Sequence, residues 1–317
     1  TWPPRVKEIL LKDAEGNLTF DTYWSRIKKN WACSVFFMSK KPYNPWMKIF
    51  YLGPEGTNSD LAARNIFTKD DEYVAAQSIE DIFEKVALSH SYYGVIPFEN
   101  SYQGVINSSL NCLIDYDLKI IKEYNFAVSH ILCSSNVNFD ANTVKKIISH
   151  PQAFGQCNNW LRENFPFAEK LVATSTAEAA SKAKEDSSLY CIANSHAIEI
   201  FDLNNHFENI QDRSDNKTRF LVIGKMIETK GEINKTSLMI NIKDQPGSLM
   251  KILKPFSELN INMTRIETRP SRNNIFLHTF FIDFEGFYED KNIIELIDQL
   301  EAMSEEIRII GSYESLN

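Results

Sequence analysis

The residues best suited to chemistry in this sequence stand where apolar, strand-like stretches end. In the run V-I-P-F-E-N-S, which starts at Val95, four apolar residues are followed directly by Glu99, Asn100 and Ser101. Polar clusters also end other apolar stretches: G-P-E-G-T from Gly53, S-H-P-Q from Ser149 and T-S-T-A-E from Thr174. A helical pattern follows each cluster, so we expect hydroxyls, carboxamides and free backbone N–H groups at strand-to-helix turns.

Such turns act either as plain helix caps or as an anion-binding surface. Ser175 with Glu178 three residues later has the pattern of a capping box, and Pro151 suits a first helical position. A helix N-terminus that carries short hydroxyls and amides also attracts carboxylates and phosphates. The number of these turns favours the second interpretation, a site for a small anionic molecule.

Thr218 and Arg219 open the last strand of the same region, after the polar segment 212–217. The guanidinium of Arg219 serves either as a surface charge or as a fork for a carboxylate, and the residues alone leave both interpretations open. Other chemistries lack their signatures, since the sequence has no P-loop, no G-x-S-x-G and no H-E-x-x-H. The six histidines are dispersed, so we expect neither a metal site nor a cofactor.

Strand and helix patterns alternate from Met47 to about Met226, which is typical of an open α/β sheet. The predicted strands are 48–52, 73–76, 93–96, a longer strand within 119–133, 144–148, 171–173, 189–192 and 218–223. The predicted helices are 58–67, 79–88, 108–114, 151–164, 176–183 and 195–200. Such sheets bind ligands beyond the carboxyl ends of their strands, where the polar turns lie. The pattern does not decide between one large sheet and two lobes.

A second, smaller unit follows a polar break at 228–235. Its predicted elements are strand 238–242, helix 247–259, strand 263–267, strand 275–284, helix 292–303 and strand 307–312. This βαββαβ order indicates a split-βαβ sandwich. The predicted domains are therefore 47–228 and 236–314.

Composition and charge limit the partners of the chain. A length of 317 residues, with 43% hydrophobic and 24% charged residues, is typical of a globular protein of two domains. A net charge of −8 argues against binding to nucleic acid or to an anionic membrane. No apolar run reaches the length of about 18 residues that a membrane span needs, and the five cysteines contain no C-x-x-C pair. We therefore expect a cytoplasmic protein that binds small molecules and has no disulfide framework.

Residues 1–46 differ from the rest in composition. Basic residues outnumber acidic ones there, and four of the five tryptophans lie in this segment. The stretch 42–45 contains two prolines, as linkers often do, and Met47 stands directly before the first apolar strand. We expect an N-terminal extension of unknown role, much of it poorly ordered.

Taken together, the polar turns resemble the motifs of the prephenate dehydratase family in order and spacing. The matching segments are Gly53–Thr57, Pro97–Ser101, Ser149–Ala153 with Gln156 and Cys157, Ser175–Ala180 and Thr218–Phe220. The second unit, through Gly247–Met250 and Glu267–Pro270, is similar to an ACT domain of the phenylalanine-binding kind. The resemblance covers Lys48 to about Tyr313. It implies a catalytic domain of two lobes, similar to type II periplasmic binding proteins, with the substrate in the cleft between them.

The resemblance also implies a reaction, in which prephenate loses carbon dioxide and its ring hydroxyl to give phenylpyruvate. By the family pattern Thr218 donates a hydrogen bond to the departing hydroxyl, and Asn100 and Gln156 complete the catalytic set. The implied substrate-binding residues are Glu99, Ser101, Ser149, Thr176, Arg219 and Phe220. Glu99 and His150 are candidates for the acid, and the ultimate proton donor stays unassigned. The enzyme would be a carbon–oxygen lyase.

For the second unit the resemblance implies allosteric inhibition by L-phenylalanine, bound between two such units. The plain alternative is a dimerisation sandwich. The implied effector-binding residues are Gly247, Ser248, Leu249, Asn260, Glu267, Thr268, Arg269 and Pro270. The helix that opens at Gly247 offers N–H groups to an amino-acid carboxylate, and Asn260 or Asn262 would hold the ammonium. Thr268 stands where the family usually has serine, which keeps the hydroxyl and adds a methyl group.

Rival functions stay open on the sequence alone. An arogenate dehydratase would act on a substrate with an amino group on the side chain, and the sequence does not separate the two enzymes. A non-catalytic sensor would keep both folds and only bind ligand, but the intact Thr218–Phe220 motif speaks against it. The segment 1–46 is too short and too little helical for the chorismate mutase domain of many relatives, so we expect no mutase activity. We expect a homodimer or a homotetramer.

Overall fold

The computed structural model describes residues 10–12, 18–20, 47–226, 230–270 and 277–316. It divides into two compact units, residues 1–44 and 45–317. In the first unit, strands β1 (Leu10–Lys12) and β2 (Leu18–Phe20) pair antiparallel. The other residues of the predicted extension 1–46 lie outside the described part. The expectation that much of the extension is poorly ordered concerns these residues and stays a prediction.

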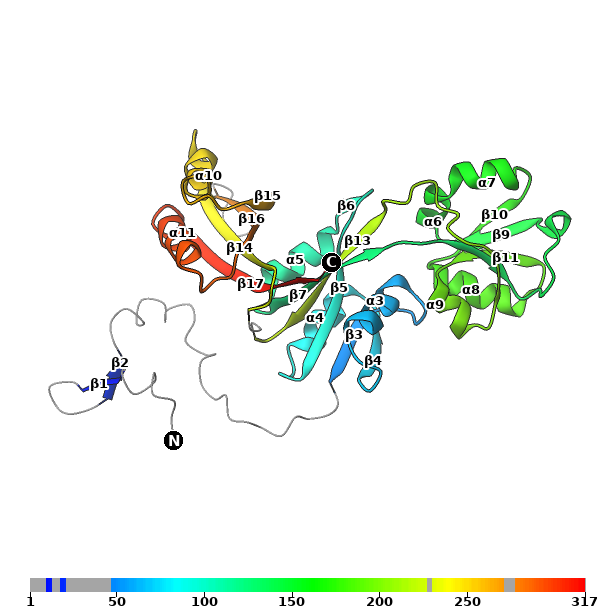
Figure 1. The fold of residues 1–317 in the computed structure, drawn as a ribbon, viewed down its shortest axis with the longest axis horizontal. Helices are drawn as coiled ribbons and strands as arrows, with labels where there is room; N and C mark the ends of the chain where they lie inside the picture. Colours follow the sequence, from blue (N-terminus) through cyan, green and yellow to red (C-terminus); the bar gives the residue numbers. More distant parts are fainter. Residues whose placement is uncertain (1–9, 13–17, 21–46, 227–229, 271–276, 317) are drawn as a thin grey trace. The chain divides into compact units, whose positions relative to one another are not determined.

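Lobe one, which comprises residues 47–127 and 217–226, contains a mixed sheet with a parallel half. Strands β3 (Lys48–Leu52), β4 (Glu72–Ala76) and β5 (Tyr92–Asn100) run parallel, with β3 in the middle. Strand β13 (Lys217–Gly224) pairs antiparallel with β5 and with β7 (Lys119–Ala127), and the short β6 (Gly104–Val105) pairs with β5. Helices α3 (Asn58–Ile66), α4 (Ile79–Val86) and α5 (Asn107–Asp115) complete the lobe (Figure 1).

The local sequence explains why these helices form where they do. Helix α4 begins after Ser78, whose Oγ accepts a hydrogen bond from the backbone N of Asp81 at 3.1 Å. Its buried side chains recur at the spacing that places them on one face, toward the core of the lobe: Ile79, Ile82, Phe83 and Val86. Capping thus sets where the helix starts, and apolar burial sets which face turns inward.

Lobe two, residues 131–207, has a five-stranded sheet in the order β10-β9-β11-β8-β12. Strands β9 (Lys146–Ser149), β10 (Glu169–Val172) and β11 (Leu189–Ala193) run parallel. Strands β8 (Ile131–Ser134) and β12 (Asn204–Phe207) add an antiparallel edge. The helices are α6 (Pro151–Gln156), α7 (Asn158–Asn164), α8 (Thr176–Glu185) and α9 (Ser195–Ile200), with a short helical turn η1 (Ala141–Thr143).

Two segments, here called the crossing segments, join the lobes. Residues 128–130 lead from β7 to β8, and residues 208–216 lead from β12 back to β13. They are bonded to each other, because Val128 N donates to Asn216 O at 2.9 Å and Ile210 N donates to His130 O at 3.0 Å. Since each segment connects the two sheets directly, any movement of one lobe against the other turns about them.

The C-terminal unit has the predicted βαββαβ order. Its elements are β14 (Asn234–Lys243), α10 (Ser248–Glu258), β15 (Met263–Pro270), β16 (Leu277–Glu285), α11 (Lys291–Glu301) and β17 (Glu306–Leu316). The strand order is β15-β16-β14-β17, and β17 pairs parallel with β7 of lobe one. The sheet of this unit therefore continues into the sheet of lobe one, as Figure 1 shows.

The predicted fold class is confirmed, with α/β lobes followed by a βαββαβ unit. The stretch 119–133 is two strands and not one, because the chain crosses between the lobes at 128–130. The predicted helix 151–164 is interrupted at Cys157, where φ is −116° and ψ is 17°. Strand β12 was not predicted. The domain boundaries 47–228 and 236–314 remain predictions.

Candidate active site

The carboxyl ends of the parallel strands in the two lobes face one another. Strands β3 and β5 end at this edge in lobe one, and β9, β10 and β11 end there in lobe two. Asn194, directly after β11, spans the gap with its Nδ2, which donates to Gly56 O at 3.1 Å and to Asn58 Oδ1 at 2.8 Å. The polar turns therefore lie along the facing edges, where open α/β sheets bind their ligands.

Gly56 allows lobe one to approach lobe two closely. Its φ of +86° lies in the left-handed region that glycine adopts without strain. A Cβ at this position would lie 3.4 Å from Ala177 Cβ and 3.5 Å from Ala197 Cα. Both alanines belong to helices of lobe two, α8 and α9. Small side chains on both sides thus bring the Gly53–Thr57 turn against the other lobe.

Asp60 of α3 forms a second contact between the lobes. Its buried carboxylate accepts from Gly56 N at 2.8 Å, and it pairs with Arg64 at 2.8 Å and with His196 of lobe two at 3.0 Å. Burial alone would raise the pKa of this carboxyl, but the bonds from His196, Gly56 and Arg64 outweigh it and hold the pKa below its usual value. Ionised Asp60 therefore stabilises the contact.

Asp60→Asn is expected to lower the free energy of unfolding by about 1.5–3 kcal/mol near neutral pH, as loss of hydrogen bonds to a charged group does. Because the folded-state pKa is depressed, this stabilisation exists above the ordinary pKa and is lost as pH falls through the folded-state value. Urea denaturation at about pH 7 and about pH 3 measures the free energy of unfolding of both proteins. The difference between the variant and the unaltered chain should be smaller in acid. Asp70→Asn, at an exposed carboxylate, is the control. A difference in free energy of unfolding that stays constant with pH would contradict the stabilising role of ionised Asp60.

Asn100 and Thr218 come together where β5 ends and β13 begins. They are opposite each other in the sheet, and Asn100 Nδ2 donates to Thr218 Oγ1 at 3.0 Å and to Asn216 Oδ1 at 3.2 Å. The Oδ1 of Asn100 accepts from Tyr102 N at 3.0 Å. Both N–H bonds of this carboxamide are therefore engaged within the protein.

This arrangement leaves the hydroxyl proton of Thr218 available. Its oxygen already accepts from Asn100, and no acceptor for its proton is found among the residues that the structure describes. Thr218 is only 9% exposed. A nearly buried hydroxyl with a fixed oxygen and an available proton suits an oxygen that gains negative charge during a reaction. In this geometry Asn100 acts through Thr218, since it orients the hydroxyl.

Asn216 is a polar residue of this corner that the sequence reasoning missed. It is 1% exposed, and its Nδ2 is buried with no hydrogen-bond partner among the described residues. A signal was present, because Asn216 stands two residues before Thr218 and period-two spacing places both on one side of an extended chain. Ser101, predicted to bind substrate, bonds instead to the main chain of Lys217, to its O at 3.0 Å and from its N at 3.1 Å.

Gln156 and Ser149 lie at the inner edge of lobe two in different settings. Gln156 Oε1 lies 2.5 Å from Nε2 of His130, and its carbonyl accepts from Asp212 N at 2.7 Å, so both crossing segments hold it. Ser149 is fully buried, and its Oγ donates to Ile192 O at 2.8 Å. Thr176 is the first residue of α8, after Ser175 as N-cap.

A cavity of about 450 Å³ opens beside the first turns of α6 and α8. Its lining includes His150, Thr174 and Glu178. Nδ1 of His150 accepts from Gln152 N at 3.2 Å and so caps α6, which occupies that nitrogen. Hydrogen bonds from Lys182 and Thr174 lower the pKa of Glu178 to about 2. Glu178 is thus a permanent anion at physiological pH.

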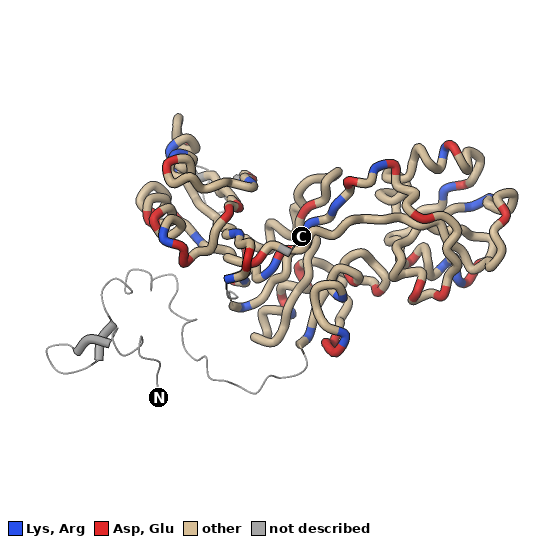
Figure 2. The backbone as a smooth tube through the Cα atoms, in the orientation of Figure 1, with Lys and Arg blue, Asp and Glu red and all other residues tan. Residues whose placement is uncertain are grey.

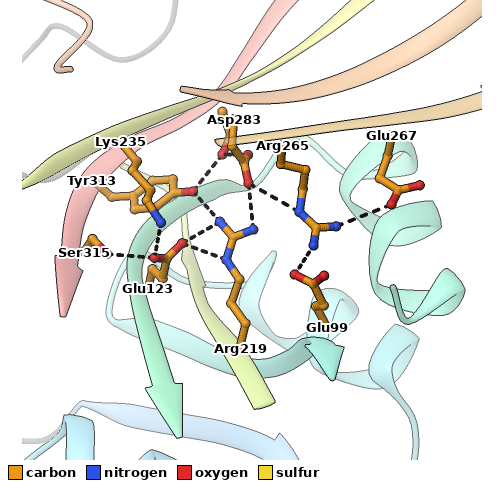
Figure 3. A network of polar contacts seen from close by, with 10 residues as sticks. Glu99, Glu123, Arg219, Lys235, Arg265, Glu267, Asp283, Tyr313 and Ser315 are labelled. Carbon is orange, nitrogen blue, oxygen red and sulfur yellow. Dashed lines mark hydrogen bonds and ion pairs between the residues drawn. The ribbon is translucent and has the colours of Figure 1, made fainter. Parts of the chain in front are cut away.

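Arg219, predicted to bind substrate, is engaged within the protein. Its guanidinium pairs with Glu123 of β7 at 2.7 Å and with Asp283 of β16 at 2.6 Å, and it donates to Tyr313 Oη at 3.1 Å (Figure 3). Neighbouring residues of a strand point to opposite faces, so Arg219 leaves β13 on the side away from Thr218. The carboxylates that the guanidinium of Arg219 binds belong to the protein itself.

Glu123 is the shared carboxylate of this network. It is fully buried, and it also accepts from Lys235 Nζ at 2.6 Å and from Ser315 Oγ at 2.7 Å. Burial would raise the pKa of Glu123, but the charges of Arg219 and Lys235 outweigh it and lower the pKa. The network ties lobe one to β14, β16 and β17 of the C-terminal unit (Figure 3).

Glu99 and Phe220, also predicted to bind substrate, make contacts within the protein. Glu99 forms an ion pair with Arg265 of β15, as Figure 3 shows, so its charge is neutralised by the C-terminal unit. Phe220 is 1% exposed and packs edge-on against Phe126, with ring centroids 6.0 Å apart. Phe220 belongs to the core of lobe one. Because its ring is buried there, it offers no surface to a ligand.

The predicted effector residues of the C-terminal unit fall on two elements. Gly247, with φ of +83°, is the N-cap of α10, and Ser248 and Leu249 form its first turn. Asn260, with φ of 52°, lies just after the end of this helix. These residues stand at opposite ends of α10.

The other predicted effector residues lie on β15. Glu267 pairs with Arg265 at 3.6 Å, and Arg269 donates to Asn107 at the start of α5 in lobe one. Thr268 stands between them and so faces the opposite side of the strand. The side chain of Pro270 lies outside the described residues. Glu267 is therefore engaged with Arg265 on the same strand, and Arg269 with lobe one.

Within the described ranges, no group of three or more His, Cys, Asp or Glu side chains gathers into a metal site. In the same ranges no helix is long and apolar enough to cross a membrane. Cys112, Cys133, Cys157 and Cys191 are buried.

Comparisons with known proteins agree with this architecture. The sequence profile of the prephenate dehydratase family matches residues 49–228, and the profile of the ACT domain matches residues 236–301. The prephenate dehydratase of Methanocaldococcus jannaschii is 35% identical over 272 residues, which cover 84% of this chain and 97% of that protein.

Solved structures share the fold over most of the chain. A prephenate dehydratase of Arthrobacter aurescens in complex with L-Phe has a TM-score of 0.77 at 26% identity, covering 84% of this chain and 89% of that one. GqqA, described as a quorum-quenching acylase, also has a TM-score of 0.77, at 25% identity, covering 85% of this chain and 98% of that one. Fold alone thus does not fix activity. Since a family profile covers more than half of the sequence and a relative aligns over nearly its full length, the chain belongs to the prephenate dehydratase family and carries a C-terminal ACT domain.

Proposed function

We propose that this chain, a carbon–oxygen lyase of its family, converts prephenate to phenylpyruvate in L-phenylalanine biosynthesis. Prephenate dianion and one proton give phenylpyruvate, carbon dioxide and water. The bond from the ring to its carboxylate breaks, its electron pair makes the ring aromatic, and the ring C–O bond breaks. Aromatisation supplies a large driving force. The protein therefore needs to hold the dianion, exclude water from the ring carboxylate and stabilise the departing hydroxyl.

The observation that carries this proposal is the Asn100–Thr218 pair. The hydrogen bond of 3.0 Å from Asn100 fixes Thr218 Oγ1 and leaves the threonine proton for the departing oxygen. A threonine hydroxyl is too weak an acid to give up its proton for good. Thr218 therefore polarises the leaving group, and the proton that completes the water comes from a group that stays unassigned.

Backbone N–H groups bind the substrate carboxylates. Arg219 does not, because its guanidinium already forms ion pairs with Glu123 and Asp283. Helix α8 begins at Thr176 on the facing edge of lobe two, and α3 begins on the facing edge of lobe one after Thr57. The N-terminal N–H groups of such helices bind anions. Their position on both facing edges supports a dianion held between the lobes.

Two substrates separate the candidate functions. The purified chain is incubated with prephenate and, separately, with arogenate, and phenylpyruvate and phenylalanine are measured. We expect phenylpyruvate from prephenate. Phenylalanine from arogenate without turnover of prephenate would make the chain an arogenate dehydratase, and turnover of neither would favour a ligand sensor.

The proposal includes feedback inhibition by L-phenylalanine at the ACT domain, in a cytoplasmic homodimer or homotetramer. The support is the ACT profile match and the L-Phe complex of the relative from Arthrobacter aurescens. The ion pairs of Asp283 with Arg219 and of Arg265 with Glu99 give this domain contacts to β13 and β5, the strands that carry Thr218 and Asn100. Calorimetry with L-phenylalanine tests the binding, with D-phenylalanine as the control ligand, and light scattering gives the assembly. Absence of binding would remove the regulatory part alone.

A further inference from the structure

His130 is a buried polar residue to which the proposed reaction gives no role. It is 3% exposed and lies on the first crossing segment. Its main chain is bonded to the second crossing segment in both directions, since its N donates to Gln211 Oε1 at 3.0 Å and its O accepts from Ile210 N at 3.0 Å. The imidazole is therefore anchored at the junction of the two lobes.

The ring of His130 faces the carboxamide of Gln156. Nε2 lies 2.5 Å from Oε1 of Gln156. Because an amide oxygen only accepts hydrogen bonds, Nε2 carries a proton and donates it. Burial lowers the pKa of His130 against the raising effect of this bond, so the ring is neutral near pH 7 and its Nδ1 carries no proton.

This bond decides which end of the Gln156 carboxamide is left for a ligand. With Oε1 turned to His130, the two N–H bonds of Nε2 point elsewhere, and no acceptor for them is found in the part of the chain that the structure describes. Gln156 is 9% exposed, so its side chain is nearly buried but reaches the surface. Amide N–H donors are what a substrate with two carboxylates and a departing hydroxyl requires.

The second crossing segment fixes the same residue through its main chain. Asp212 N donates to Gln156 O at 2.7 Å, and the carboxylate of Asp212 accepts from Asn159 N and Trp160 N at 3.0 Å each, at the start of α7. This segment continues directly into Thr218 on β13. Gln156 is thus tied to the stretch of chain that leads to Thr218, although α6 belongs to lobe two.

We propose that His130 is a positioning residue for the reaction. Its Nε2–H holds Oε1 of Gln156, so that the amide N–H groups of Gln156 face the substrate and keep their place relative to Thr218 when the lobes move. The role rests on the proposed function, because it is a role in that reaction.

Substitution of His130 tests this role through Gln156. His130→Phe keeps the ring volume and removes the donor, and it should lower kcat/KM by about tenfold to a hundredfold, as loss of an orienting partner does in other sites. Gln156→Ala should lower it at least as much, and the double variant no further than Gln156→Ala. His130→Gln places an amide N–H near the position of Nε2 and should restore most of the activity.

Each result has a contrary outcome. If His130→Gln were as inactive as His130→Phe, the ring would be needed for proton transfer and the positioning role would be wrong. If the losses of His130→Phe and Gln156→Ala multiplied in the double variant, His130 would act independently of Gln156. His206→Phe is the control, since His206 bonds to Ser134 in the same lobe at 2.8 Å and should leave kcat/KM unchanged.

A spectroscopic measurement separates failure of this role from failure of the proposed function. Nuclear magnetic resonance of the ¹⁵N-histidine-labelled chain should show His130 as the neutral Nε2–H tautomer. The Nδ1–H tautomer would overturn the positioning role even in an active enzyme. If the chain showed the Nε2–H tautomer but did not turn over prephenate, the hydrogen bond from His130 to Gln156 would stand and the proposed function would be wrong.

Discussion

Thr218→Ala is expected to lower kcat roughly thirtyfold to a thousandfold, which corresponds to a loss of about 2–4 kcal/mol of transition-state stabilisation. The free energy of unfolding should change little. The reason for the lower kcat is geometric, because Asn100 holds the oxygen of Thr218 and leaves its proton for the departing hydroxyl. Alanine removes that donor and keeps the strand. Steady-state kinetics with prephenate measures kcat and KM, and urea denaturation checks the fold.

Two matched variants sharpen this result. Thr218→Ser keeps the hydroxyl and should retain most of the activity, whereas Thr218→Val keeps the shape and should be as slow as Thr218→Ala. Thr143→Ala removes a different threonine hydroxyl, one that bonds to Tyr190 in lobe two at 2.7 Å, and kcat should not change. Near-normal kcat of Thr218→Val would remove Thr218 from the mechanism.

Arg219→Leu is expected to destabilise the protein by about 3–5 kcal/mol, the usual result when one partner of a buried ion pair is removed. The guanidinium lies between two carboxylates that are themselves buried, Glu123 and Asp283. Without it, Asp283 loses its ion pair at 2.6 Å and Glu123 keeps Lys235. Urea denaturation followed by circular dichroism gives the change in the free energy of unfolding.

The cause of this loss can be isolated. Without Arg219, Asp283 keeps as an ion pair only a long contact to Arg265 Nε at 3.9 Å among the described residues. Asp283→Asn in the Arg219→Leu background removes this poorly compensated charge, so the double variant should be less destabilised than the sum of the single changes. Arg213→Leu is the control, because its pair with Asp215 is exposed and contributes little. If Arg219→Lys folded normally but raised KM for prephenate severalfold, Arg219 would contact substrate after all, against the geometry described here.

Much of the fold followed from local pattern. Apolar period and capping residues predicted most helices and strands, because Pro151 and Ser175 act at the positions where their helices start. Strand β12 and the split of 119–133 were missed, since both depend on where the chain passes from one sheet to the other. The parallel pairing of β17 with β7 joins distant segments, and no local signal marks it.

The site was predictable where the residues belong to the motifs of the family resemblance, and less so where residues outside those motifs contribute. The family resemblance pointed to Asn100 and Thr218, and the structure places them in contact. For Arg219, the sequence does not reveal that Glu123 and Asp283, 96 and 64 positions away, supply its carboxylates. Strand alternation was the available warning, because Thr218 and Arg219 are adjacent and so face opposite sides.

The central claim is that the hydroxyl of Thr218, fixed by Asn100, assists loss of the ring hydroxyl of prephenate. The most direct measurement is the amount of phenylpyruvate and carbon dioxide formed from prephenate by the unaltered chain and by Thr218→Val under the same conditions. Both products should form in equal amounts, and the variant should form them roughly thirtyfold to a thousandfold more slowly than the unaltered chain. Equal rates from the two proteins, or no phenylpyruvate from either, would contradict it.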